Sequence, residues 1–203
     1  MVMGMPTKNY QMMLDEEAEI QAYTIDKMST AIVRIMDALK EDEDIFKLLY
    51  FKDAKALGRP LDTKAKEIFE NGLIVKDKDD NQKIKAYPFD PEPAISEGIF
   101  VRIYFSDGTL SQDGVYSKSQ LNLDIICSHD MWLTSDSESK VKIIRPYGLM
   151  NRINQILTKE RIDKLPVPIG FTHLTVNSKF ECIRVYLDTI AIEKGGDKVD
   201  SSR

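Results

Sequence analysis

The sequence has few cysteines and no long hydrophobic run. Two cysteines among 203 residues, Cys127 and Cys182, make no disulfide framework. The longest uninterrupted apolar run is the four residues from Leu48 to Phe51, whereas a bilayer-spanning helix needs about 20. The N-terminal sequence MVMGMPTKNYQMMLDEEAEI lacks a basic region followed by an apolar core. We therefore expect neither a transmembrane helix nor a secretory signal, and a protein kept in a cytoplasm-like compartment.

Positive charge is also scarce. The 28 Lys and Arg residues are outnumbered by 33 Asp and Glu residues, which gives a formal net charge of −5 at pH 7. Nucleic-acid binding depends on clustered Lys and Arg, so this balance argues against DNA binding as the main function. A chain of this size buries roughly 70% of the surface that its unfolded form exposes, and it can fold without a disulfide or a metal.

Signatures of the common catalytic sites are missing. The glycines form neither GxGxxG nor GxxxxGK[ST], and no GxSxG or HExxH occurs. The residues that could hold zinc or act as a nucleophile are Cys127, His129, His173 and Cys182. Topology leaves a four-ligand zinc site open, but zinc ligands usually come in close pairs, and a lone strand cysteine usually packs in a core. We therefore predict no metal, cofactor or catalytic residue, and keep a Cys/His zinc-dependent enzyme as the alternative.

The first third of the sequence predicts helices. From Asp15 to about Lys40 a helical stripe is formed by Met28, Ile32, Ile35 and Leu39. Asp44 is expected to cap a short second helix that Gly58-Arg59-Pro60 closes, and a further helix is expected from Asp62 to Glu70. From Lys76 to Glu97, a charge cluster and a proline-rich stretch predict a loop or extended connection.

After Gly98 the hydrophobic period changes from helical spacing to two. Ile99, Val101, Ile103 and Phe105 alternate with more polar residues, and Leu121, Leu123, Ile125 and Cys127 do the same, which predicts an antiparallel strand pair. Between them, the polar stretch Ser106–Gln120 is expected to be a long loop that is mobile in the free protein. A helix from Pro146 carries Leu149, Ile153, Ile156 and Leu157, and two more strands are expected over 171–177 and 180–192.

This order predicts an α+β fold, in which a small, mostly antiparallel sheet with one packed helix follows an N-terminal helical arm. The expected organisation is a helical arm and extended connection over residues 1–97, a sheet domain over 98–192 and a disordered tail over 193–203.

Aromatic side chains and one arginine leave alternatives open. Trp132, Tyr104, Phe105, Tyr116 and Tyr147 could stack on nucleic-acid bases, but without interleaved Lys or Arg we favour core or interface packing. Arg145 could meet a partner's carboxylate or, as the simpler expectation, form a salt bridge where its helix begins.

Five segments together resemble the neck or tail-completion proteins of tailed bacteriophages. They are EDIFKLLYFKDAKAL (Glu43 to Leu57), IFVRIYF, LNLDIICSHDMW, RPYGLMNRINQIL and FECIRVYLDT. The resemblance covers roughly Asp44 to Ile192 and carries no catalytic residue.

The resemblance implies a structural, non-enzymatic protein of the virion, assembled in the host cytoplasm. Such a tail terminator forms a homo-oligomeric ring, a hexamer or dodecamer, that caps the tail tube and joins it to the head connector. DNA would pass through the channel without specific binding, and no membrane is involved. The long N-terminal region leaves a head-completion stopper or adaptor ring open, and a cytoplasmic interaction module outside any virion is a further hypothesis.

Overall fold

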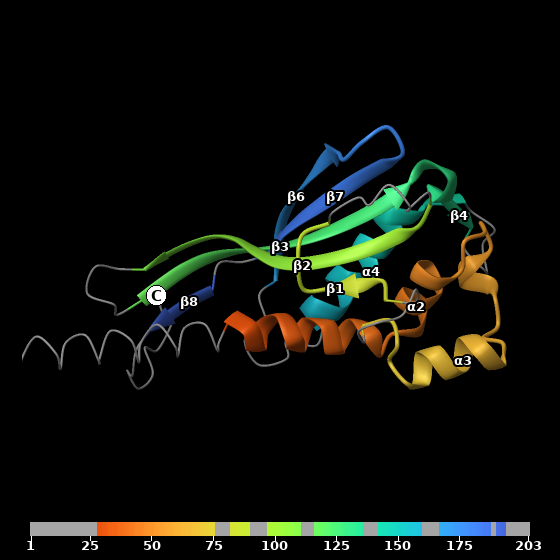
Figure 1. The fold of residues 1–203 in the computed structure, drawn as a ribbon, viewed down its shortest axis with the longest axis horizontal. Helices are drawn as coiled ribbons and strands as arrows, with labels where there is room; N and C mark the ends of the chain where they lie inside the picture. The colour runs from red at the N-terminus through yellow and green to blue at the C-terminus, as the bar shows by residue number, and fades with distance from the viewer. Residues whose placement is uncertain are drawn as a thin grey trace, which may run out of the picture.

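The computed structural model is α+β, with helices before a mixed sheet and one long helix inserted between strands (Figure 1), so the expected fold class is confirmed. The described residues are 28–75, 82–89, 97–110, 116–135, 142–159, 167–187 and 190–193. The elements are the N-terminal helix (28–40), α2 (Glu43–Tyr50), the 3₁₀ helix η1 (Ala56–Gly58), α3 (Thr63–Glu70), β1 (Ile84–Lys85), β2 (Ile99–Leu110), β3 (Tyr116–Ser128), the 3₁₀ helix η2 (His129–Met131), β4 (Leu133–Ser135), β5 (Lys142–Ile144), α4 (Arg145–Lys159), β6 (Pro168–Thr175), β7 (Phe180–Leu187) and β8 (Ile190–Glu193).

The main sheet has the strand order β1-β2-β3-β7-β6, and β8 pairs with the outer part of β3. Among the described strands of this sheet, the β1–β2 pair is parallel and the other pairs are antiparallel. A separate two-stranded sheet joins β4 and β5. The sheet is therefore mostly antiparallel, as the sequence predicts, but β1 and the β4–β5 pair are too short to leave a periodic signal in the sequence.

The expected loop from Ser106 to Gln120 is wrong at both of its ends, and its middle, residues 111–115, lies outside the described residues. β2 continues to Leu110 and β3 begins at Tyr116, with one register shift between Phe105 and Asp107. Figure 1 shows this hairpin projecting as an arm from the rest of the sheet, with β8 alongside β3. Strands pair through main-chain hydrogen bonds, which need no apolar side chain. The polar composition of this stretch therefore does not indicate a strand. The expected long last strand is likewise two, β7 and β8.

One face of the sheet packs against the helices. The odd-numbered residues from Ile99 to Phe105 in β2 and from Leu121 to Cys127 in β3 point into this core, as period-two alternation predicts, and α4 covers it with its expected apolar stripe. The N-terminal helix and α2 contribute to the same core. Its members include Ile35, Leu39, Ile45, Leu49, Ile99, Val101, Ile103, Leu121, Leu123, Ile125, Cys127, Leu149, Ile153, Ile156, Leu157, Ile183 and Val185.

The helix boundaries follow side-chain caps. Asp42, rather than the expected Asp44, caps α2, because its carboxylate accepts a hydrogen bond from the Ile45 amide at 2.9 Å. Asp62 caps α3 in the same way, and Gly72 takes a φ of 61° just after it, where the expected stop lies. The expected start of the first helix at Asp15 lies outside the described residues, as do 194–203 of the expected tail.

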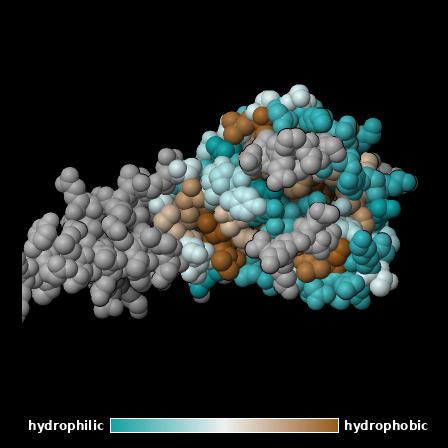
Figure 2. Space-filling view, viewed as in Figure 1, coloured by the Kyte–Doolittle hydropathy of each residue, from teal (hydrophilic) through white to brown (hydrophobic). Residues whose placement is uncertain are grey.

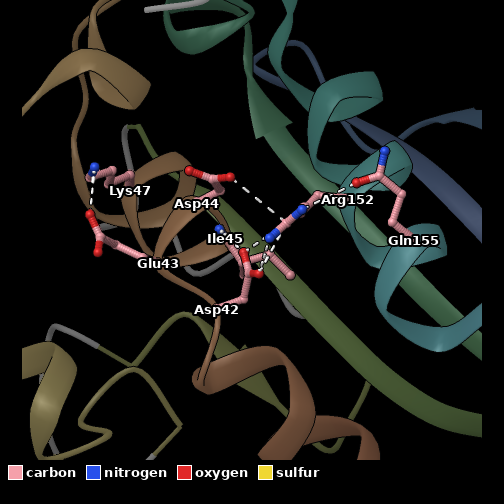
Figure 3. Close-up of polar contacts among 7 residues, drawn as sticks. All are labelled: Asp42, Glu43, Asp44, Ile45, Lys47, Arg152 and Gln155. Atoms are coloured by element: carbon pink, nitrogen blue, oxygen red, sulfur yellow. Dashed lines mark hydrogen bonds and ion pairs between the residues drawn. The ribbon is translucent and has the colours of Figure 1, made fainter. Parts of the chain in front are cut away.

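Asp42 also ties α2 to α4 (Figure 3). Arg152 of α4 donates through Nε to both carboxylate oxygens, at 3.1 and 3.0 Å, and through Nη2 to Oδ2 at 2.6 Å. The Asp42 side chain is 12% exposed and that of Arg152 is 39% exposed. Hydrogen bonding to Asp42 raises the pKa of Arg152. One carboxylate therefore caps a helix and holds a second helix against it.

Replacing Asp42 with alanine is expected to lower the free energy of unfolding by about 2 kcal/mol, because the helix cap contributes about 1 kcal/mol and the half-exposed ion pair about as much. Chemical denaturation measures this. Glu43→Ala is the matched control, since Glu43 is 53% exposed and pairs with Lys47 on the surface of the same helix; its expected effect is below about 0.5 kcal/mol. Equal losses in the two variants would contradict the tie between α2 and α4.

The hydrophobic residues visible in Figure 2 form several separate patches between hydrophilic ones. Exposed large hydrophobic side chains among the described residues are accordingly few: Val33, Tyr87, Leu133, Ile144, Ile169 and Phe171. Among these same residues, no helix combines the length and the apolar character needed to cross a membrane.

Candidate interaction surface

Four of the exposed hydrophobic side chains belong to β6 and to the separate β4–β5 pair. Ile169 and Phe171 of β6 are 61% and 56% exposed, and Leu133 and Ile144, which pair between β4 and β5, are 49% and 40% exposed. Tyr147 of α4 contacts Phe171, with the two ring centroids 6.3 Å apart and the ring planes nearly perpendicular. We call these five residues the β6 surface. Large exposed apolar side chains are typical of contact surfaces.

The main chain of β6 adds to this surface. β6 pairs with β7 on one side, and within the described part of the chain no strand pairs with its other side. Unpaired amide and carbonyl groups along an edge strand are a template for another strand, and proteins usually protect such an edge with charges, prolines or bulges. β6 carries Pro168 and a register shift at its start. Ile169 and Phe171 nevertheless leave large exposed apolar side chains on this edge strand.

A polar cluster borders the β6 surface. The Nε2 atoms of His129 and His173 lie 3.4 and 3.3 Å from the two carboxylate oxygens of Glu181, and the His173 ring stacks on Trp132 with centroids 5.9 Å apart. Both histidines are about half exposed. This arrangement gives the apolar surface a polar rim, as in many protein–protein interfaces.

The candidate zinc set is not brought together. Cys127 points into the helix-covered core, whereas Cys182 pairs in register with Ile126 and packs in a small cluster on the opposite face of the sheet. His129 lies in η2 rather than on the strand of Cys127, and only His129 and His173 share a neighbour, Glu181. No group of three or more His, Cys, Asp or Glu side chains among the described residues is arranged to hold a metal ion.

Neither cysteine is poised as a nucleophile. Burial raises the pKa of each thiol, Cys127 and Cys182, to about 12, whereas reactive cysteines have a lowered thiol pKa. In the native protein at pH 8 we expect alkylation by iodoacetamide about a thousandfold slower than for an ordinary thiol, since three pKa units separate them. Intact-mass measurement checks this, with the denatured protein as the control that takes up two groups. Rapid native labelling of either cysteine would contradict it.

The opposite face of the sheet carries two cation clusters. Asp124 accepts hydrogen bonds from Arg184 at 2.8 and 2.9 Å and from the Tyr104 hydroxyl at 2.7 Å. Burial, and the hydrogen bond to Asp124, raise the pKa of Tyr104. Arg102, 4% exposed, lies near the rings of Tyr87, Phe89 and Phe100, and burial lowers its pKa to about 10.

The aromatic residues considered for base stacking are thus engaged within the protein. Tyr104 bonds Asp124, Trp132 stacks on His173, Tyr147 contacts Phe171, and Phe105 packs at the margin of the core. The side chain of Tyr116 lies outside the described residues. These are packing contacts within the protein, which the sequence favours over base stacking.

Arg145 pairs with no carboxylate among the described residues, so the expected salt bridge where its helix begins is wrong. It is fully buried, and its Nη1 atom donates to the carbonyl oxygens of Leu48 and Phe51 at 3.2 and 2.6 Å. Its Nη2 atom donates to the carbonyl oxygens of Lys52 and Asp53. These carbonyls belong to the last turn of α2 and the segment after it, so the guanidinium completes that helix end. Burial lowers the pKa of Arg145.

The sequence pattern does not predict the β6 surface. Ile169, Phe171 and His173 alternate with Gly170 and Thr172 in the same way as the residues of a strand with one buried face. Only the position of β6 at the end of the sheet leaves them exposed.

A comparison with protein families finds a match to the family model YomW over residues 42–189. The match begins at Asp42, the cap of α2, and ends just after β7. A comparison with curated proteins finds no match.

Proposed function

The chain belongs to the YomW family, whose name is associated with bacteriophages, and from this premise we propose that it is a structural protein of a virion. In this proposal it forms a homo-oligomeric ring, a hexamer or dodecamer, at the head–tail junction. The ring caps the tail tube and joins it to the head connector. The protein is assembled in the host cytoplasm and has no enzymatic activity.

The observation that carries the proposal is the β6 surface. Ile169 and Phe171 stand more than half exposed on an edge strand, whereas most described apolar side chains of β2, β3 and β7 pack in two buried clusters. An exposed edge with large apolar residues is an aggregation hazard in a monomer, and assembly with another subunit removes it. A repeated contact of this kind is what a ring requires.

Charge and cysteine chemistry are consistent with a passive channel. A net charge of −5 weakens attraction to phosphate groups, so DNA can pass a ring of such subunits without being held. The two buried thiols, with their raised pKa, give no support to the alternative of a zinc-dependent enzyme.

Deletion of the gene from a phage that encodes this chain tests the junction role. We expect filled heads and separate tails in electron micrographs, and restoration of complete particles when the protein is supplied from a plasmid. Normal infectious particles in the deletion strain would contradict the proposal.

The level of the ring is tested by adding purified protein to isolated heads and isolated tails. Binding to tails alone supports a tail terminator, because a terminator caps the tail tube. Binding to filled heads alone would instead assign the protein to a stopper or adaptor ring.

A further inference from the structure

We propose that the face of the sheet opposite α4 binds, beside Arg102 of β2, a carboxylate group carried by an acidic peptide segment of a partner protein. We call this place the Arg102 site, and its residues are Lys85, Tyr87, Phe89, Phe100 and Arg102. It is separate from the β6 surface, and the inference does not depend on the proposed ring role.

Strand alternation places Arg102 on this face. The neighbouring side chains of Val101 and Ile103 are fully buried in the helix-covered core, so the Arg102 side chain points to the opposite side. Phe100, two residues earlier, points the same way and belongs to the small buried cluster there. Lys85 of β1 pairs in register with Arg102, which places a second cation beside it.

The Arg102 guanidinium is only partly hydrogen-bonded. Its Nη1 atom donates to the main-chain carbonyl oxygens of Lys83 and Val101, each at 2.9 Å. Its Nε atom is buried and has no hydrogen-bond partner within the described part of the chain. A guanidinium presents its donors as a planar fork that fits the two oxygens of a carboxylate. Because Nη1 is engaged, the side of the fork that carries Nε and Nη2 is the one that suits such a ligand.

No carboxylate of the described residues pairs with Arg102. Asp124, its partner across β2 and β3, instead accepts from Arg184 at 2.8 and 2.9 Å and from the Tyr104 hydroxyl at 2.7 Å. Arg102 is 4% exposed, and burial lowers its pKa to about 10. The equally buried Arg145 donates to four carbonyl oxygens, whereas Arg102 donates to two. A buried charge normally has a partner, and a carboxylate would complete the set for Arg102.

Aromatic rings around the guanidinium favour a peptide over a free phosphate. The centroids of the Phe100, Phe89 and Tyr87 rings lie 5.3, 5.4 and 5.9 Å from Cζ of Arg102. Tyr87 is 50% exposed and offers apolar surface to the residues beside a bound carboxylate. Tyr and Arg are also enriched at protein–protein interfaces. Phosphate-rich partners need clustered Lys and Arg, whereas this chain has a net charge of −5.

The segment after β1 controls access to the Arg102 site. Residues 86–89 belong to no helix or strand, and 86–88 are exposed. From this segment the rings of Tyr87 and Phe89 contact the guanidinium. Displacement of a short exposed segment costs little free energy compared with opening of the core. A carboxylate can therefore reach Nε while the sheet stays intact.

An NMR titration with two matched tripeptides tests the Arg102 site. The probes are acetyl-Ala-Glu-Ala-amide and acetyl-Ala-Gln-Ala-amide, which differ by one charge. With the glutamate peptide at millimolar concentration we expect saturable shifts of the Arg102 Nε–H signal and of the main-chain amides of 85–87 and 100–102. With the glutamine peptide we expect none. No saturable shift with the glutamate peptide would overturn the inference, and so would tighter binding of inorganic phosphate.

Two variants and a control locate the bound carboxylate, with the dissociation constant from the same titration as the readout. Arg102→Lys keeps the charge but loses the fork, and it is expected to weaken binding at least about tenfold, the effect of one charge-assisted hydrogen bond. Lys85→Gln is expected to weaken binding about twofold to fivefold. Lys142→Gln, an exposed position on β5 in the separate sheet, is the matched control and should bind like the wild type.

Equal affinities in the wild type, Arg102→Lys and Lys85→Gln would show only non-specific attraction to surface cations and would overturn the inference. Lys85 is only half-buried, so Lys85→Gln decides the question alone if Arg102→Lys does not fold.

Discussion

Replacing Ile125 with aspartate is expected to abolish cooperative folding. Ile125 is fully buried at the centre of β3, between its pairing partners Val101 and Ile183. A carboxylate at this position must either stay charged without a partner or become protonated, with a pKa raised by up to 3–5 units for a fully buried group. That shift alone costs about 4–7 kcal/mol, in the range of the whole stability of a typical domain.

Circular dichroism during thermal or chemical unfolding measures the effect of Ile125→Asp. The control is Ile125→Val, which removes one methylene group and is expected to cost about 1 kcal/mol. A soluble Ile125→Asp protein with a cooperative transition close to that of the wild type would show that the central strand is assigned wrongly.

Replacing Arg145 with methionine is expected to lower the free energy of unfolding by about 3–5 kcal/mol. Methionine keeps much of the side-chain volume but donates no hydrogen bond, so the carbonyl groups of Leu48, Phe51 and the next two residues lose their common donor. Each buried carbonyl left without a partner costs about 1–3 kcal/mol, and loss of the buried charge offsets part of this sum because the guanidinium no longer has to be desolvated.

Arg59→Met is the matched control for Arg145→Met, because it makes the same chemical change at an exposed position. Arg59 is 53% exposed and pairs with Asp53, which is itself 44% exposed. Its replacement is expected to change stability by less than about 1 kcal/mol. Denaturant titration of the two variants measures their free energies of unfolding. Equal values would mean that Arg145 does not stabilise the end of α2.

The sequence predicts the core better than the polar contacts. The period of two in Ile99, Val101 and Ile103, and the helical stripe of α4, follow directly from burial of one face, and they are found in the structure. The cap of α2 does not follow from the sequence, because Asp42 and Asp44 carry the same side chain two residues apart. Arg152, 110 residues away, selects Asp42 by binding its carboxylate.

The site depends on information that local patterns do not carry. Cys127 and Cys182 lie on opposite faces because of the register between β3 and β7, which no short-range pattern specifies. Arg145 bonds main-chain carbonyls, and these have no sequence signature. The exposure of Phe171 follows from the place of β6 at the end of the sheet, a property of the strand order rather than of the strand.

The copy number of the protein in purified virions tests the central claim most directly. Quantitative mass spectrometry against a labelled standard, with a protein of known copy number as reference, gives this number. A ring at the head–tail junction predicts about six or twelve copies per particle by its rotational symmetry. Absence from purified virions, or hundreds of copies per particle, would contradict the account.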